Sequence, residues 1–161
     1  MSHVISLDKC IEKADHTGIL VLTGRNLRQF PMSAQDLSDL QDTLEADISK
    51  NRFDKIPREI CMFSGLEKLR CYHNSIRIVP EYITYMSNLR HLDLSRNYIP
   101  SLPPEMCRLN LVSLDLSCNR LVALPVDIGQ MVTLQKLDLG CNSLRMPNTC
   151  LLYTSPSPRD S

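Results

Sequence analysis

Asparagine recurs in this sequence at a nearly constant interval, and this period restricts the fold more than any other feature. The positions are 51, 74, 97, 119 and 142, so successive asparagines stand 23, 23, 22 and 23 residues apart. A fixed period of this length is typical of chains that stack one small structural unit many times. We therefore predict a solenoid rather than a globule with one closed core.

Each repeat also places its apolar residues in a fixed phase. Before every asparagine, two small or apolar residues stand two apart, and this alternation predicts short half-buried strands at 46–48, 69–71, 92–94, 114–116 and 137–139. After it comes an apolar residue followed by proline, then apolar residues three apart, such as Ile83 and Met86. That spacing predicts one or two helical turns that begin after the proline.

A unit of strand, bend and helical turn cannot enclose its own leucines, so neighbouring units must share one core. We predict a right-handed α/β horseshoe with parallel strands on its concave face and helical turns on its convex face. At each bend, the asparagine amide would satisfy backbone groups that the turn leaves unpaired. The predicted asparagine ladder consists of Asn51, Asn74, Asn97, Asn119 and Asn142.

The repeats are expected to occupy residues 19–146, with a degenerate first copy in which Arg25 takes the asparagine position. Residues 1–18 predict a capping helix that Ser6 begins and Gly18 ends, because Leu7, Cys10, Ile11 and Ala14 share one face. A membrane-binding helix is the alternative, but the helix has more acidic than basic residues.

Regular spacing is lost near the C-terminal end of the sequence. Residues 147–161 are rich in serine and proline, and we expect them to be disordered and non-native, because LLYTSPSPRD resembles translated adaptor or vector sequence. The alternative is a regulatory tail in which Ser155 and Ser157, each followed by proline, are phosphorylated.

The charge balance argues against a general binder of nucleic acid or of anionic membranes. Eighteen basic and 18 acidic residues give a net charge of zero. Proteins that bind nucleic acid usually have an excess of positive charge on the binding surface. No apolar run approaches the ~20 residues of a membrane span, and the start MSHVISLDKC has no secretory signal pattern. Seven cysteines without CxxC pairs favour free thiols in a reducing compartment. We therefore expect a cytoplasmic protein.

No pattern of catalytic chemistry is present. The sequence lacks a glycine-rich phosphate loop, GxSxG, HExxH and paired carboxylates, so we predict no catalytic residue, cofactor or metal. His73 and His91 lie on neighbouring repeats but are offset, which favours a solvated pair over a metal site. Cys118 and Cys141 share one repeat position, where small residues in a tight bend are favoured over a disulfide or zinc site.

The outward residues of the predicted strands form the candidate binding surface, which we call the concave face. Three successive strands carry aspartate at their centre, beside Tyr72 and Arg96, and this predicts a protein partner with a basic surface. The alternative is that exposed strand positions are simply polar. The predicted binding residues are Asp47, Lys68, Arg70, Tyr72, His91, Asp93, Arg96, Asp115, Lys136 and Asp138, flanked by Glu45, Ser49, Ser95, Ser113 and Ser117.

The unit LxxLxLxxNxLxxLPxxIxxL is typical of cytosolic leucine-rich-repeat proteins. Over about residues 6–144, the segments GILVLTGRNLRQFP and LRHLDLSRNYIPSLPPEMCRLNLVSLDLSCNRLVALP resemble the leucine-rich repeat and calponin homology domain-containing family. The resemblance implies an adaptor or scaffold at the actin cortex and in Rho-family signalling, with a calponin homology domain far downstream. The alternatives are a docking domain of a larger phosphatase, kinase or ubiquitin ligase, and a Ras-pathway scaffold.

Overall fold

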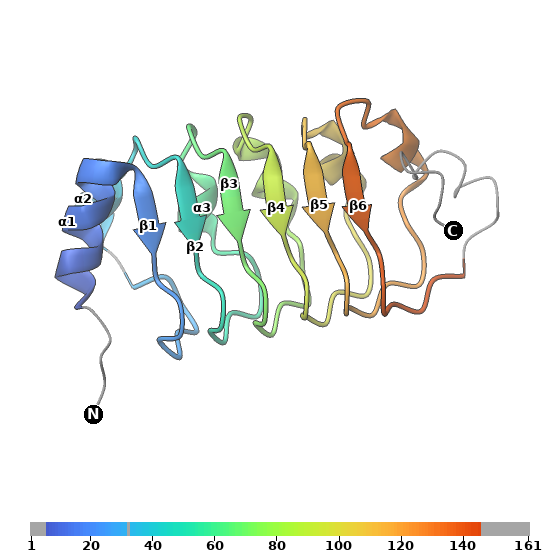
Figure 1. The fold of residues 1–161 in the computed structure, drawn as a ribbon, viewed down its shortest axis with the longest axis horizontal. Coiled ribbons are helices and arrows are strands. Elements are labelled where there is room, and N and C mark those ends of the chain that lie inside the picture. Colours follow the sequence, from blue (N-terminus) through green and yellow to red (C-terminus); the bar gives the residue numbers. More distant parts are fainter. Residues whose placement is uncertain (1–5, 32, 146–161) are drawn as a thin grey trace.

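The computed structural model describes residues 6–31 and 33–145, and these build a stack of parallel strands with helical turns on one side (Figure 1). Within that part of the chain the strands pair in sequence order, each parallel to the next. They are β1 (Ile19–Val21), β2 (Glu45–Asp47), β3 (Lys68–Arg70), β4 (His91–Asp93), β5 (Ser113–Asp115) and β6 (Lys136–Asp138).

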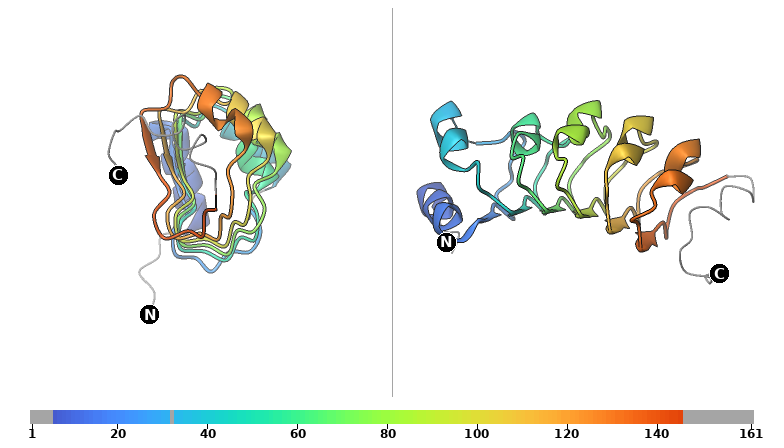
Figure 2. Two further views of the ribbon diagram at one scale, coloured as in Figure 1. Left: turned by 90° about the vertical axis from the view of Figure 1, so that its right-hand side faces the viewer. Right: turned by 90° about the horizontal axis from the view of Figure 1, so that it is seen from above.

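The helical segments that follow the strands lie across the core from the sheet, as the view along the stack shows (Figure 2). After β1 and β2 come α2 (Ala34–Asp39) and α3 (Arg58–Cys61), and later repeats have single 3₁₀ segments. The apolar–proline pairs begin these turns because Pro57 and Pro80 hold an extended backbone with φ of -62° and -75°. The 3₁₀ segments are η1 (Glu81–Tyr85), η2 (Pro104–Arg108) and η3 (Val126–Gln130). The predicted leucine-rich-repeat solenoid is confirmed.

All five predicted strands are present, but each begins one residue earlier than predicted. The apolar pair fixed the prediction at Ala46 to Ile48, whereas β2 includes the outward residue Glu45. Parallel pairing nevertheless continues beyond the strand, since Ile48 N donates to Arg70 O at 2.9 Å. The prediction therefore has the correct inward and outward faces. The degenerate first copy supplies a sixth strand, β1.

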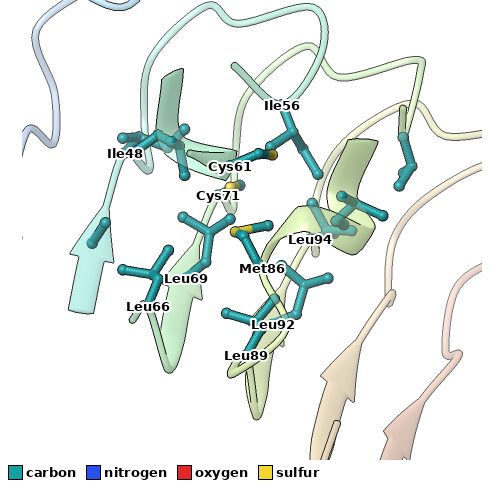
Figure 3. Close-up of a cluster of buried hydrophobic side chains, with 14 of the residues drawn as sticks. Ile48, Ile56, Cys61, Leu66, Leu69, Cys71, Met86, Leu89, Leu92 and Leu94 are labelled. Atoms are coloured by element: carbon teal, nitrogen blue, oxygen red, sulfur yellow. The ribbon is translucent and has the colours of Figure 1, made fainter. Parts of the chain in front are cut away.

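Leucines, isoleucines and cysteines from neighbouring repeats meet in one continuous core (Figure 3). Leu69 and Leu92 point inward from β3 and β4, and Met86 approaches them from the convex side; their exposed fractions are 0%, 2% and 0%. Each fully buried leucine contributes about 1.5–3 kcal/mol to stability. Thr43 occupies one of the apolar positions. Its buried hydroxyl is not left unsatisfied, because it donates a hydrogen bond to Leu40 O at 2.7 Å.

The predicted N-terminal helix is α1 (Leu7–Thr17), which packs against β1. Ser6 Oγ accepts a hydrogen bond from Lys9 N at 3.3 Å, and Gly18 ends the helix with φ of 76°. Cys10 and Ala14 are buried in the common core. The apolar face of α1 is thus directed towards the repeats.

The periodicity did not predict α2, which lies in the 26-residue step between Arg25 and Asn51. Its first turn is closed by Leu37 N donating to Ser33 O at 3.1 Å, and Leu40 follows it into the core with 1% exposure. The additional residues of the long repeat therefore form a helix.

The predicted tail at 147–161 lies outside the described residues. Within those that are described, no helix has the length and apolarity to span a bilayer.

Candidate protein-binding face

Strand register arranges the outward residues of the concave face in two straight rows. Adjacent strands lie ~4.8 Å apart, so each row is a line of neighbouring side chains. The first row contains Glu45, Lys68, His91, Ser113 and Lys136, and the second contains Asp47, Arg70, Asp93, Asp115 and Asp138. Arg70, Lys136 and Asp138 are exposed, and the others are partly exposed.

Residues at the C-terminal ends of the strands differ more in their surroundings. Tyr72 is partly exposed with Lys50 Nζ 5.7 Å from its ring centroid, and Arg96 is exposed. The expectation that Ser49 and Ser95 flank this face was wrong, because they are only 0% and 9% exposed. Their hydroxyls satisfy neighbouring groups instead, since Ser49 Oγ accepts from Tyr72 N at 3.1 Å.

The aspartates of the second row have a structural role that the sequence analysis missed. Each uses Oδ1 to accept a hydrogen bond from the backbone N–H two residues later, as in an Asx-turn. The donors are Ser49 N, Ser95 N, Ser117 N and Gly140 N, all at 3.0 Å from Asp47, Asp93, Asp115 and Asp138 respectively. The recurring Asp-x-Ser pattern was the available signal.

At β3 the same position is Arg70, which has no acceptor for this bond. The amide two residues later belongs to Tyr72, and it donates instead to Ser49 Oγ from the preceding repeat. A buried serine thus replaces the missing carboxylate. This exchange leaves β3 with a cation between the Asp47 and Asp93 positions of the second row.

The concave face also has an apolar end that sequence reasoning did not include. Ile19 and Val21 point outward from β1 and are 42% and 46% exposed. They pair in register with Glu45 and Asp47 of β2. Extending the repeat register to the degenerate first copy would have identified them. The face therefore changes from apolar at β1, through mixed charge, to net acidic at β4–β6, where Asp93, Asp115 and Asp138 outnumber the single lysine, Lys136.

The asparagine side chains form hydrogen bonds along the stack at the ends of the strands. Asn97 Nδ2 donates to Leu94 O of its own repeat at 3.0 Å and to Cys71 O of the preceding one at 3.1 Å. Its Oδ1 accepts from Ile76 N at 3.0 Å. Equivalent bonds involve Asn51, Asn74, Asn119 and Asn142. In the first copy, the Arg25 N–H donates to Asn51 Oδ1 at 2.9 Å.

Immediately before each asparagine, a non-glycine residue adopts the left-handed backbone conformation. Such residues usually pay ~1–2 kcal/mol for a positive φ. Lys50, His73, Arg96, Cys118 and Cys141 have φ of 59°, 57°, 57°, 56° and 56°. The tight bend expected for the two cysteines is this left-handed position.

The histidines and cysteines that were weighed as ligands do not gather into a metal site. His73 lies in the bend, whereas His91 Nδ1 lies 2.8 Å from Ser113 Oγ on the sheet. A hydrogen bond with Cys141 raises the pKa of the Cys118 thiol. Over residues 6–31 and 33–145, no group of three metal-ligating side chains is present.

Comparison with known proteins agrees with this geometry. The Leucine Rich Repeat family model matches residues 88–109 and 110–131. A leucine-rich-repeat protein of Leptospira interrogans has a similar structure, with a TM-score of 0.80 and 27% identity over 92% of this chain and 38% of its own. The chain is therefore a leucine-rich-repeat domain.

Two mouse relatives define the family more narrowly. Leucine-rich repeat and calponin homology domain-containing protein 1 and DISP complex protein LRCH3 are each 44% identical to the chain over 84% of its length. The chain spans only 19% and 17% of these relatives. Over its leucine-rich repeats, the chain belongs to the leucine-rich repeat and calponin homology domain-containing family.

Proposed function

We propose that this chain is the partner-binding portion of an adaptor or scaffold, and that a protein with a basic surface docks on its concave face. The run of Asp93, Asp115 and Asp138 in register carries the proposal. Like charges ~4.8 Å apart on neighbouring strands repel one another. Cations from a partner would relieve that repulsion and set the specificity and rate of association.

The other residues of the concave face would determine the orientation in which the partner binds. Ile19 and Val21 offer apolar contact at one end, and the aspartates offer charge at the other. Tyr72 and Arg96, at the strand ends, belong to residue types that often anchor protein interfaces. A matching partner has an apolar end and a basic end, and its polypeptide crosses the strands rather than following one of them.

The test neutralises charge without removing the turn hydrogen bond. Asparagine keeps the Oδ1 acceptor, so Asp93→Asn with Asp115→Asn should leave the melting temperature nearly unchanged. Affinity purification from cells should then recover the partner several-fold less well than with wild type. Asp54→Asn with Glu105→Gln, which removes equal charge elsewhere, is the matched control.

Equal partner recovery by the concave double variant and wild type would refute the concave-face assignment. Equal loss with the control pair would attribute the effect to net charge instead. Lysine at positions 93 and 115 is a less suitable substitution, because it removes the turn acceptor along with the charge.

For the whole protein, we propose a role at the cortical actin cytoskeleton and in Rho-family signalling, within the cytoplasm. The family membership supports it, since relatives are named for a calponin homology domain and one is named for the DISP complex. The complete transcript should encode a calponin homology domain downstream. A phosphatase, kinase or ubiquitin-ligase domain there would instead favour a docking domain of an enzyme.

A further inference from the structure

Although the net charge is zero, basic residues are concentrated along one edge of the solenoid. Six loops leave the C-terminal ends of the strands and lie along the lower edge in Figure 1; we call this the loop edge. The loop edge consists of residues 24–28, 51–55, 74–78, 97–101, 119–123 and 142–145. Its exposed cations are Arg28, Arg52, Lys55, Arg77, Arg120 and Arg145, and its single acidic residue is Asp54.

Backbone hydrogen bonds hold these loops side by side, so the cations of five loops form a row, and the loop at 97–101, which has no cation, places Tyr98 within it. Arg52 N donates to Leu27 O at 2.7 Å, and Arg120 N donates to Ile99 O at 3.0 Å. The edge where the chain enters the strands is different. Its connections at 41–44, 64–67, 87–90, 110–112 and 132–135 contain only Asp42, Glu67 and Arg90 as charged residues.

In the middle of the loop edge, two of the cations lie over one aromatic ring. The guanidinium carbons of Arg77 and Arg120, from the repeats on either side, lie 5.5 Å and 4.7 Å from the ring centroid of Tyr98. Stacking on an aromatic face restricts the guanidinium groups while leaving N–H donors at their rims. These donors are suited to phosphate or carboxylate oxygens.

Apolar side chains stand between the cations of this edge. Ile78 is 58% exposed, Val122 is 47% exposed and Tyr98 is 40% exposed. Basic residues mixed with aliphatic and aromatic ones are characteristic of surfaces that lie on the headgroup region of a membrane.

We propose that the loop edge binds the surface of an anionic phospholipid bilayer. The edge is a protruding row of loop tips, and a planar surface can touch many loop tips at once (Figures 1 and 2). An acidic protein segment would more often be held in a groove. The concave face is a separate side of the stack, so it stays accessible to a protein partner when the edge is docked. This proposal does not depend on the proposed function.

The experiment measures binding to vesicles of one-third phosphatidylserine and two-thirds phosphatidylcholine by cosedimentation. Wild type should bind them, bind pure phosphatidylcholine far less, and release as salt is added. Each basic residue near an anionic surface contributes about fivefold to affinity. Arg77→Gln with Arg120→Gln should therefore weaken binding about 25-fold. Lys13→Gln with Arg108→Gln, which removes equal charge away from the edge, should retain binding close to wild type.

A second edge variant, Arg52→Gln with Lys55→Gln, separates lipid contact from any change around Tyr98, and circular dichroism verifies that each variant is folded. No binding to the anionic vesicles, or equal binding by edge and control variants, overturns the proposal. Polyglutamate is the comparison ligand. If it binds through the loop edge while the vesicles do not, the edge recognises acidic protein rather than lipid.

Discussion

At the scale of single residues, Asn97 illustrates how one buried amide stabilises two repeats together. It is 4% exposed, and its donors and acceptor serve backbone groups on both sides of the bend. Water cannot easily replace these partners in a buried turn. Stability should therefore depend on the asparagine far more than its small apolar area suggests.

Asn97→Ala should destabilise the protein by about 3 kcal/mol, because it leaves Ile76 N and strand-end carbonyls unsatisfied in the interior. Asn110→Ala, on an exposed connection, should change stability by less than about 0.5 kcal/mol. Urea denaturation of both variants compares them directly. Similar midpoints would mean that the ladder contributes little.

The left-handed position before each asparagine gives a second test. At Arg96, with φ of 57°, glycine should be more stable than valine by about 1–2 kcal/mol, because a β-branched side chain clashes in this region. At Arg52, which is not among the positive-φ residues, the glycine variant should be no more stable than the valine variant, or should be less stable. Melting temperatures of the four variants give the result, and the same order at both sites would contradict the backbone explanation.

The buried thiols predict a loss of stability in alkali. Burial raises the pKa of Cys61 to about 12 from an ordinary 9.0, and raises that of Cys71 well above it. Above pH 9 the unfolded thiols lose protons that the folded ones retain, so stability falls as pH rises towards the folded pKa. The slope approaches ~1.4 kcal/mol per pH unit for each thiol. Denaturant titrations at several pH values across this range give the free energy of unfolding at each pH. This free energy should fall less steeply with pH for Cys71→Ala than for wild type. Equal dependence on pH would refute the assignment.

At the scale of elements, the strands differ in how well they are covered. Leu92 and Leu94 of the β4 repeat are 2% and 0% exposed, whereas Leu137 and Leu139 around β6 are only partly buried. In a stack of repeats, stability comes from contacts between neighbours, so the element with less coverage opens more easily.

Amide hydrogen exchange should consequently be faster through β6 than through β4. The relevant amides include Lys136 N, which donates to Val112 O at 3.1 Å, and Leu94 N, which donates to Asp115 O at 2.8 Å. Exchange followed by mass spectrometry on peptides covering each strand provides the comparison. Uniform protection along the stack would show that the repeats open as one unit.

Elements that follow the period could be predicted from the sequence, and α1 could be predicted from its capping residues, but α2 could not. The strands and the asparagine ladder recur in phase, so their burial is visible in the spacing. Helix α2 lies in the one long step, where no second copy reveals the pattern. The turn role of Asp93 was hidden because an outward carboxylate has the same sequence pattern whether it binds a partner or its own backbone.

At the scale of the whole molecule, charge is organised by face rather than by segment. Arg52 and Arg120 directly follow their asparagines, whereas Arg77 lies three residues after Asn74, so no single column of the sequence shows all three as a group. Only the stacking of loops brings them to one edge, while Asp93 and Asp115 gather on the sheet. A net charge of zero therefore did not describe either surface.

Carboxyl footprinting of the complex with its captured partner tests the central claim most directly. Carbodiimide-driven labelling of exposed carboxylates, measured residue by residue by mass spectrometry, should show Asp93, Asp115 and Asp138 protected when the partner is bound. Asp54 on the loop edge and Glu105 on the convex face should label equally with and without it. If the three aspartates label unchanged while the convex carboxylates become protected, the partner does not bind the concave face.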